Sequence, residues 1–139
     1  MELTVTNQPR QEDDEKIICA TRAYNHQFVD MAWSPVSVYV RDDQDEIIAG
    51  LTGKIFGNWL HVEFLWVSED HRGKSFGSKV LSAAESEAIK KGCVASTLDT
   101  FSFQALEFYK KQGYEVVGSL DGYYEKHQRH YLKKVLVQT

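Results

Sequence analysis

Cysteine is scarce in this chain, because Cys19 and Cys93 are the only two among 139 residues. They do not form the C-x-x-C pairs of redox motifs and zinc sites, so we expect reduced thiols that pack in the fold. His127 and His130 have the spacing H-x-x-H, but neither a helical pattern nor a third ligand accompanies them. No metal site is therefore predicted.

Long apolar runs are also missing. The longest, VEFLWV and IIAGL, are far shorter than the roughly 20 residues of a membrane-spanning helix. The N-terminal stretch MELTVTNQPR lacks the cationic and then apolar pattern of a signal peptide. We therefore expect a cytoplasmic protein without a membrane partner.

Positive charge is in the minority, since 16 Lys and Arg face 20 Asp and Glu and leave a net charge of -4. This balance argues against a nucleic-acid partner and favours neutral or cationic ones. No repeat, low-complexity tract or linker interrupts the sequence. We expect one domain over residues 1–139.

Glycine is too sparse for the common nucleotide-binding loops. The stretch HRGKSFGS, residues 71–78, contains the GKS that ends a Walker A motif, but the required earlier glycine is replaced by Ser68. The fingerprint G-x-G-x-x-G is absent as well, because Gly73 and Gly77 do not flank a single residue. A nucleotide kinase is thus disfavoured.

The elements that are present alternate between a period of two and a helical period. Strands are expected at 3–8, 36–41, 46–56, 59–67, 95–100, 114–120 and 129–137, and helices at 12–29, 76–91 and 103–112. The first three strands after the first helix read as an antiparallel meander, because short turn sequences separate them. This order predicts an α/β fold with a single mixed, mostly antiparallel sheet and flanking helices.

HRGKSFGS is then a turn from a strand into a helix. Small residues at 73, 75, 77 and 78 present backbone N–H groups at the helix start, where anions and especially phosphates bind. Arg72 and Lys74 add positive charge to an otherwise acidic chain. The alternative is that the glycines only permit a tight turn.

Two stretches in this order, LWVSEDHRGKSFGSKVL and QALEFYKKQGY, resemble the GNAT superfamily of acyl-CoA-dependent N-acetyltransferases. The resemblance covers about residues 36–136. It implies a fold with splayed central parallel strands, and acetyl-CoA as co-substrate. The family motif Q/R-x-x-G-x-G/A binds the pyrophosphate through main-chain amides; Arg72 and Gly77 match its ends, and Ser75 replaces its middle glycine.

The resemblance also implies roles for matching residues. Strand 59–67 would carry a β-bulge and splay from strand 95–100, which leaves room for the pantetheine arm. Tyr109 matches the tyrosine that protonates the departing thiolate, and Ser102 stands where many members have an asparagine that contacts the cofactor. The implied cofactor-binding residues are Leu65, Trp66, Val67, Arg72, Gly73, Lys74, Ser75, Phe76, Gly77, Ser78, Ser102 and Tyr109.

Acyl transfer to an amine also needs a base, because an alkyl ammonium has a pKa near ~10 and must lose a proton before it attacks. The alternation of WLHVEFLWV places His61 and Glu63 on one face, up to any bulge. Glu63 is the first candidate and His61 the second. Glu63 could instead be an exposed sheet residue or pair with a lysine, and Tyr109 could be only a core tyrosine with its hydroxyl at the rim.

These inferences predict an N-acetyltransferase that moves the acetyl group of acetyl-CoA to a primary amine of a small, cationic acceptor by direct transfer in a ternary complex. Trp33, Trp59 and Trp66 could line the acceptor pocket or serve packing. The alternative is a non-catalytic acyl-CoA-binding sensor or partner-binding module on the same fold, because Ser75 and Ser102 depart from the family pattern. A homodimer is left open.

Overall fold

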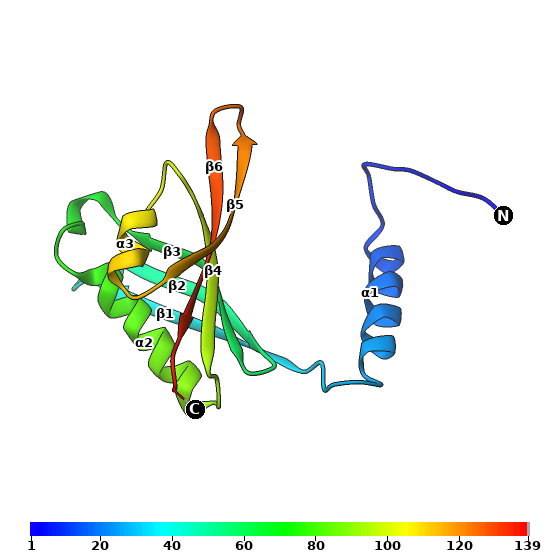
Figure 1. The fold of residues 1–139 in the computed structure, drawn as a ribbon, viewed down its shortest axis with the longest axis horizontal. Coiled ribbons are helices and arrows are strands. Elements are labelled where there is room, and N and C mark those ends of the chain that lie inside the picture. Colours follow the sequence, from blue (N-terminus) through cyan, green and yellow to red (C-terminus); the bar gives the residue numbers. More distant parts are fainter. Residues whose placement is uncertain (139) are drawn as a thin grey trace. The chain divides into compact units, whose positions relative to one another are not determined.

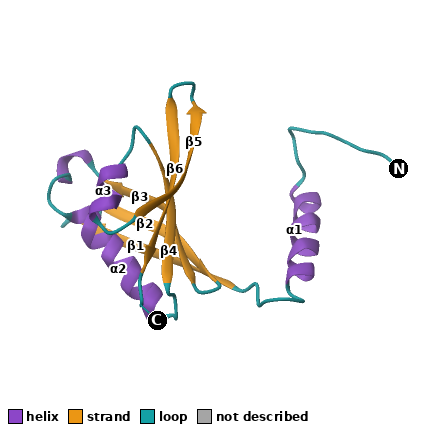
Figure 2. Cartoon of the chain, viewed as in Figure 1, coloured by secondary structure: helices purple, strands orange, loops and turns teal. Residues whose placement is uncertain are grey.

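The computed structural model describes residues 1–138 of the chain (Figure 1, Figure 2). The helices are α1 (Gln11–Asn25), the short 3-10 helix η1 (Glu69–His71), α2 (Phe76–Lys90) and α3 (Leu106–Lys111). The strands are β1 (Trp33–Arg41), β2 (Ile47–Phe56), β3 (Trp59–Val67), β4 (Ala95–Phe101), β5 (Glu115–Tyr123) and β6 (His127–Val135). The chain divides into two compact units, Met1–Ala32 and a second unit that begins at Trp33. The single domain expected over 1–139 stays a prediction.

The first unit contains α1, whose first turn carries Glu12, Asp13 and Asp14. Three carboxylates at the positive end of the helix dipole stabilise this start. The helix ends at Asn25 rather than at the expected residue 29, and turn-type bonds such as Phe28 N to Asn25 O at 2.9 Å follow it. The strand expected at 3–8 was wrong, because a β-strand needs a hydrogen-bonding neighbour and these residues have none.

The second unit is built on a six-stranded sheet in the order β1-β2-β3-β4-β6-β5. All neighbouring strands are antiparallel except β3 and β4, which run parallel. The predicted meander and the mixed, mostly antiparallel sheet are therefore confirmed. Helix α2 packs against β1, β2 and β3, and Figure 1 shows α2 and α3 together beside the sheet.

Beyond their first residues, β3 and β4 separate. Only residues 59–61 of β3 pair with residues 95–97 of β4. Just past that point, Thr52 pairs with Phe64 while Gly53 pairs with Val62, so Glu63 is the extra residue of a bulge. A side chain on Gly53 would come within 2.6 Å of the His61 carbonyl oxygen, so glycine is required beside the bulge. The bulge and the splayed parallel strands agree with the fold that the resemblance implied.

The core lies between the sheet and the two helices of the second unit. Its fully buried side chains include Leu51, Leu60, Val80, Leu81, Cys93 and Leu132. Burial raises the pKa of the Cys93 thiol, which keeps it protonated and inert. No helix among residues 1–138 is long and apolar enough to cross a lipid bilayer.

A polar network is buried in this core. The Tyr114 hydroxyl lies 2.8 Å from both Glu85 Oε2 and Ser96 Oγ, and Lys134 Nζ donates to Glu85 Oε1 at 2.9 Å. Each of these groups has a partner, so the buried carboxylate is compensated. The network joins α2 to β4, to β6 and to Tyr114, the residue just before β5, and thereby fixes α2 on the sheet.

Candidate functional site

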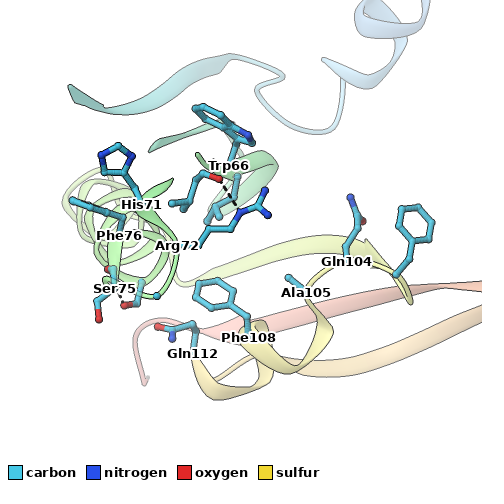
Figure 3. Close-up of a pocket in the computed structure, with 15 residues that line it drawn as sticks. Trp66, His71, Arg72, Ser75, Phe76, Gln104, Ala105, Phe108 and Gln112 are labelled. Carbon is cyan, nitrogen blue, oxygen red and sulfur yellow. Dashed lines mark hydrogen bonds between the residues drawn. The ribbon is translucent and has the colours of Figure 1, made fainter. Parts of the chain in front are cut away.

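A cleft of 720 Å³ opens where β3 ends and α2 begins (Figure 3). One wall consists of residues 65–67 at the end of β3, and the opposite wall consists of the loop before α3 and of α3 itself. Most of the sequence-predicted cofactor residues line this cleft, namely residues 65–67, 72, 73 and 75–78. Because β3 and β4 separate beside it, the cleft reaches toward the gap between the two strands.

The N-terminus of α2 is poor in internal partners. The first intrahelical bond runs from Lys79 N to Ser75 O at 3.1 Å, so the N–H groups of Phe76, Gly77 and Ser78 precede it. No side chain caps this end and no acidic residue lies in the first turn. Helix α1, by contrast, has three carboxylates in its first turn. The free N–H groups and the positive end of the helix dipole therefore favour an anion at the start of α2.

Two cationic residues precede the same helix end in the chain. Arg72 lies just before it and donates from Nε to the Val67 carbonyl oxygen at 3.2 Å, while Lys74 is exposed and lies outside the lining of the cleft. Positive side chains near the positive end of a helix dipole are unfavourable unless an anion binds between them. The arrangement thus fits a phosphate-bearing ligand.

Ser75, at the point where the turn enters α2, adopts φ 67° and ψ 15°. This is the left-handed region, which glycine enters freely and other residues enter at a cost. The family motif has glycine at this position, so serine keeps the glycine conformation. Although serine replaces the glycine of the motif, residue 75 still has a backbone conformation that glycine favours.

Gly77 lies where α2 approaches α3. A side chain on Gly77 would come within 3.2 Å of Phe108 Cζ, tighter than ordinary packing. Phe108 also lines the cleft, so glycine at this position lets the helix start lie close to the ring without pushing it into the cavity. The glycine thus has two uses, an open backbone at the helix start and a close approach of helices.

The loop before α3 makes the far wall of the cleft. Gln104 Oε1 accepts a hydrogen bond from Phe101 N at 2.8 Å and lies 3.3 Å from Thr100 Oγ1, and these bonds hold the loop before the helix begins. The helix expected at 103–112 consequently starts later, at Leu106. Figure 3 shows Gln104 on the opposite side of the cleft from Ser75.

Ser102 does not line the cleft. Its hydroxyl accepts from Gln128 N at 3.0 Å and lies 3.2 Å from His127 Nδ1. Both partners belong to β6, so Ser102 ties the loop to the β5–β6 hairpin. The predicted contact between Ser102 and the cofactor stays a prediction.

Tyr109 lies on α3 and belongs to the buried core; it is not among the residues that line the cleft, although its neighbour Phe108 is. Its ring is 8% exposed and packs against Phe108 and Tyr114, with ring centroids 5.2 and 6.0 Å away. Burial, followed by the charge of Asp99, raises the pKa of the Tyr109 hydroxyl above its ordinary value. The Tyr109 hydroxyl makes no hydrogen bond to another described residue. Since every fully buried side-chain oxygen among residues 1–138 has a hydrogen-bond partner, this hydroxyl must be in contact with solvent. It is thus a protonated group available to a ligand.

The two base candidates on β3 lie outside the lining of the cleft. Glu63, the bulge residue, is 3.4 Å from Lys54 Nζ through Oε2. This is the lysine pair that the sequence left as the alternative. His61 lies at the last residue paired with β4 and is half-buried beside Phe56, with ring centroids 6.3 Å apart. Both flank the point where β3 and β4 part.

Several lining residues were not predicted from the sequence. They are His71, Phe103, Gln104, Ala105, Phe108 and Gln112. His71 is held by Ser68, whose Oγ lies 2.6 Å from Nδ1. The remainder flank or belong to α3, and only the stretch QALEFYKKQGY gave a signal for them. Within residues 1–138, no group of three His, Cys, Asp or Glu side chains is placed to hold a metal ion.

Comparisons with known proteins agree with this geometry. Residues 6–114 match the model of the acetyltransferase (GNAT) family. The chain is 36% identical over 101 residues to blasticidin-S acetyltransferase of Streptomyces morookaense, which covers 72% of this chain and 74% of that protein. It is also similar to a solved acetyltransferase of Bacillus cereus ATCC 14579, with a TM-score of 0.86, 33% identity, and 95% and 97% of the two chains covered.

A more distant structure, an aminoglycoside 6'-N-acetyltransferase complexed with coenzyme A, has the same fold, with a TM-score of 0.68 at 16% identity over 100% of this chain and 99% of that one. The named relatives are acetyltransferases, which supports an enzyme rather than a non-catalytic module. With a family model that matches most of its length, the chain belongs to the GNAT family of acetyltransferases.

Proposed function

We propose that the protein transfers the acetyl group of acetyl-CoA to a primary amine of a small, cationic acceptor, directly within a ternary complex. The observation that carries this proposal is the uncapped start of α2, with cations around it, at one end of a 720 Å³ cleft. The pyrophosphate of acetyl-CoA supplies the anion that this helix end lacks. The distant relative solved with coenzyme A supports the same choice.

The donor fits the cleft by chemistry and by length. The N–H groups of residues 76–78 bind the pyrophosphate, with Arg72 and Lys74 beside them. The pantetheine arm then lies along residues 65–67, whose main chain has lost its β4 neighbour and is free to bond to the arm's amides. The thioester thereby approaches the gap between β3 and β4.

Transfer removes two protons from the acceptor nitrogen and replaces a C–S bond by a C–N bond. The acceptor ammonium first loses one proton to the base; its nitrogen then attacks the acetyl carbonyl carbon, forms the C–N bond and gives up its second proton to solvent. The C–S bond breaks, the thiolate of coenzyme A takes the proton of the Tyr109 hydroxyl, and the tyrosinate regains a proton from solvent. Tyr109 stays protonated through the neutral range, as a general acid must, while its raised pKa makes it a weaker acid than an exposed tyrosine.

Glu63 is the first candidate for the base and His61 the second. Glu63 is the bulge residue, close to the point where β3 and β4 separate. The ion pair between Glu63 and Lys54 is half-exposed, so the ammonium group of an acceptor can compete with Lys54 for the carboxylate. We expect Glu63→Gln to shift the rise of the pH-rate profile to higher pH. An identical profile would assign the base to His61 or to water.

Thermal unfolding with acetyl-CoA, coenzyme A and Mg-ATP in parallel tests the donor. A ligand that binds only the native state stabilises it by ~2.7 kcal/mol at a hundredfold excess over Kd. We expect stabilisation by acetyl-CoA and coenzyme A only. Stabilisation by Mg-ATP alone, or by none of the three, would contradict the donor assignment.

Thiol release from acetyl-CoA tests the acceptor. The panel comprises blasticidin S, spermidine, an aminoglycoside and glycine as an uncharged-side-chain control. Blasticidin S is included because a relative 36% identical over 101 residues is named for it. We expect release with cationic amines and little with glycine. Donor binding without release with any amine would contradict the transferase proposal.

A further inference from the structure

Five rings form a cluster on the surface of the second unit, which we call the aromatic shelf. Its members are Phe101, Phe103, Tyr123, Tyr124 and His127, from the end of β4, the loop that follows and the β5–β6 hairpin. Phe101 and Phe103 stack with centroids 5.3 Å apart at 11°, and His127 meets Phe103 edge-on at 4.8 Å. Tyr123 and Tyr124 contact Phe101 at 5.3 and 5.8 Å.

The aromatic shelf is continuous with the cleft. Phe103 belongs to both, and its neighbour Gln104 lies on the opposite side of the cleft from Ser75, as Figure 3 shows. The shelf therefore begins at the end remote from the proposed phosphate site. Phe103 is 56% exposed and Tyr124 is 72% exposed, so both rings are open to a ligand.

The hairpin carries unfavourable backbone angles to present Tyr124. Tyr124 has φ 47° and the next residue, Glu125, has φ 69°. Residues 124–126 form the turn, and its positive φ angles favour Asn and Gly, so a tyrosine is poorly suited to it. Because the Tyr124 side chain is mostly exposed, core burial does not compensate for the strain. Strain of this kind at an exposed residue points to a use other than folding.

The shelf is also held rigidly. Ser102 exchanges hydrogen bonds with Gln128, from Ser102 N to Gln128 O at 2.8 Å and from Gln128 N to Ser102 Oγ at 3.0 Å. Beneath it, Arg129 donates to Asp99 at 2.8 Å and lies over the Phe101 ring at 5.6 Å. These contacts fix the β4 loop to the hairpin before any ligand arrives, which lowers the entropy lost on binding.

We propose that the aromatic shelf binds a planar ring of the acceptor, so that the enzyme prefers primary amines that carry an aromatic or heteroaromatic ring. The assignment rests on the proposed function for its link to acetyl transfer. Flat rings stack on exposed aromatic faces, whereas puckered saturated rings of equal size do not. The shelf thus selects acceptors by ring planarity.

The test uses two amines with the same carbon skeleton, 2-phenylethylamine with a planar aromatic ring and 2-cyclohexylethylamine with a puckered saturated ring. Labelled protein saturated with coenzyme A is titrated with each, and NMR shifts give affinity and location. We expect 2-phenylethylamine to bind at least about fivefold more tightly, as one stacked ring allows. The shifts should map to Phe103, Tyr124 and His127.

Two substitutions in the same turn separate the ring from the backbone. Tyr124→Asn removes the ring and suits the positive φ, and it should abolish the preference for the planar amine while leaving coenzyme A affinity unchanged. Glu125→Asn makes the matched change at the next residue and should keep the preference. A preference that survives Tyr124→Asn, equal affinities for the two amines, or shifts elsewhere would overturn the proposal.

Other outcomes distinguish this site from the proposed function. If Tyr124→Asn weakened the binding of coenzyme A itself, the shelf would bind the adenine of the donor, and the acceptor assignment would be wrong. Ring preference in the titration without thiol release would support the site and contradict acetyl transfer. Thiol release from acetyl-CoA at equal rates with both amines would support acetyl transfer and contradict the ring preference of the shelf.

Discussion

Ser75→Gly tests how the turn before α2 holds its ligand. Ser75 has φ 67°, a conformation that costs a residue with a side chain about 1–2 kcal/mol and costs glycine nothing. Glycine also loosens the unfolded chain, which offsets about 0.4–1 kcal/mol of the gain. Since Ser75 makes no side-chain cap, no hydrogen bond is lost. The net expectation is a stabilisation of about 0.5–1 kcal/mol.

For a chain of this size, that gain raises the unfolding midpoint by about 2 to 4 °C. Coenzyme A affinity should change by less than about threefold, because the strain is already present without ligand and therefore enters the free and bound states alike. Thermal unfolding measures the first quantity, and isothermal titration with coenzyme A measures the second.

Asp45→Gly is the matched control. Asp45 has φ 64° in the exposed turn between β1 and β2 and is not among the residues that line the cleft. Its ion pair with Arg41 at 3.8 Å is exposed and weak. It should raise the midpoint without changing coenzyme A affinity. A loss of coenzyme A affinity beyond threefold in Ser75→Gly alone, or a lower midpoint, would refute the account of the turn.

Three further predictions concern single side chains. Tyr109→Phe should lower kcat about a hundredfold with acetyl-CoA affinity unchanged, and an unchanged kcat in steady-state assays would remove Tyr109 as the acid. Gly77→Ala should push Phe108, 3.2 Å from the added carbon, into the cleft and weaken coenzyme A by about fivefold, as titration would show; unaltered affinity would contradict the close approach. Tyr114→Phe should cost about 1–3 kcal/mol in urea unfolding, because Glu85 loses a buried partner. Burial raises the pKa of Tyr114 above its ordinary value of 10.0, so the folded state holds this proton more tightly than the unfolded state. The free energy of unfolding should therefore fall as the pH rises above about 10, and it should fall less in Tyr114→Phe than in the unsubstituted protein.

Local patterns predicted the parts of the fold that depend on neighbours in the chain. The meander followed from alternating β-branched residues, and α2 from its helical period and the turn before it. The strand at 3–8 failed although LTVTNQ has a strand composition, because pairing with another strand is a long-range property. The late start of α3 accompanies a turn over residues 101–104, in which Gln104 bonds to the main chain of Phe101 through both its own main chain and its side chain.

The site divides in the same way. The sequence by itself determined the turn that we propose binds the pyrophosphate, because small residues at a strand-to-helix junction carry their own free N–H groups. Only the tertiary structure brought Phe103 and Phe108 to the cleft, turned Ser102 toward the hairpin and set Asp99 near Tyr109. Those contacts join residues from β4, α3 and β6, and no local period encodes which side chains meet across a sheet once its strands have paired and separated.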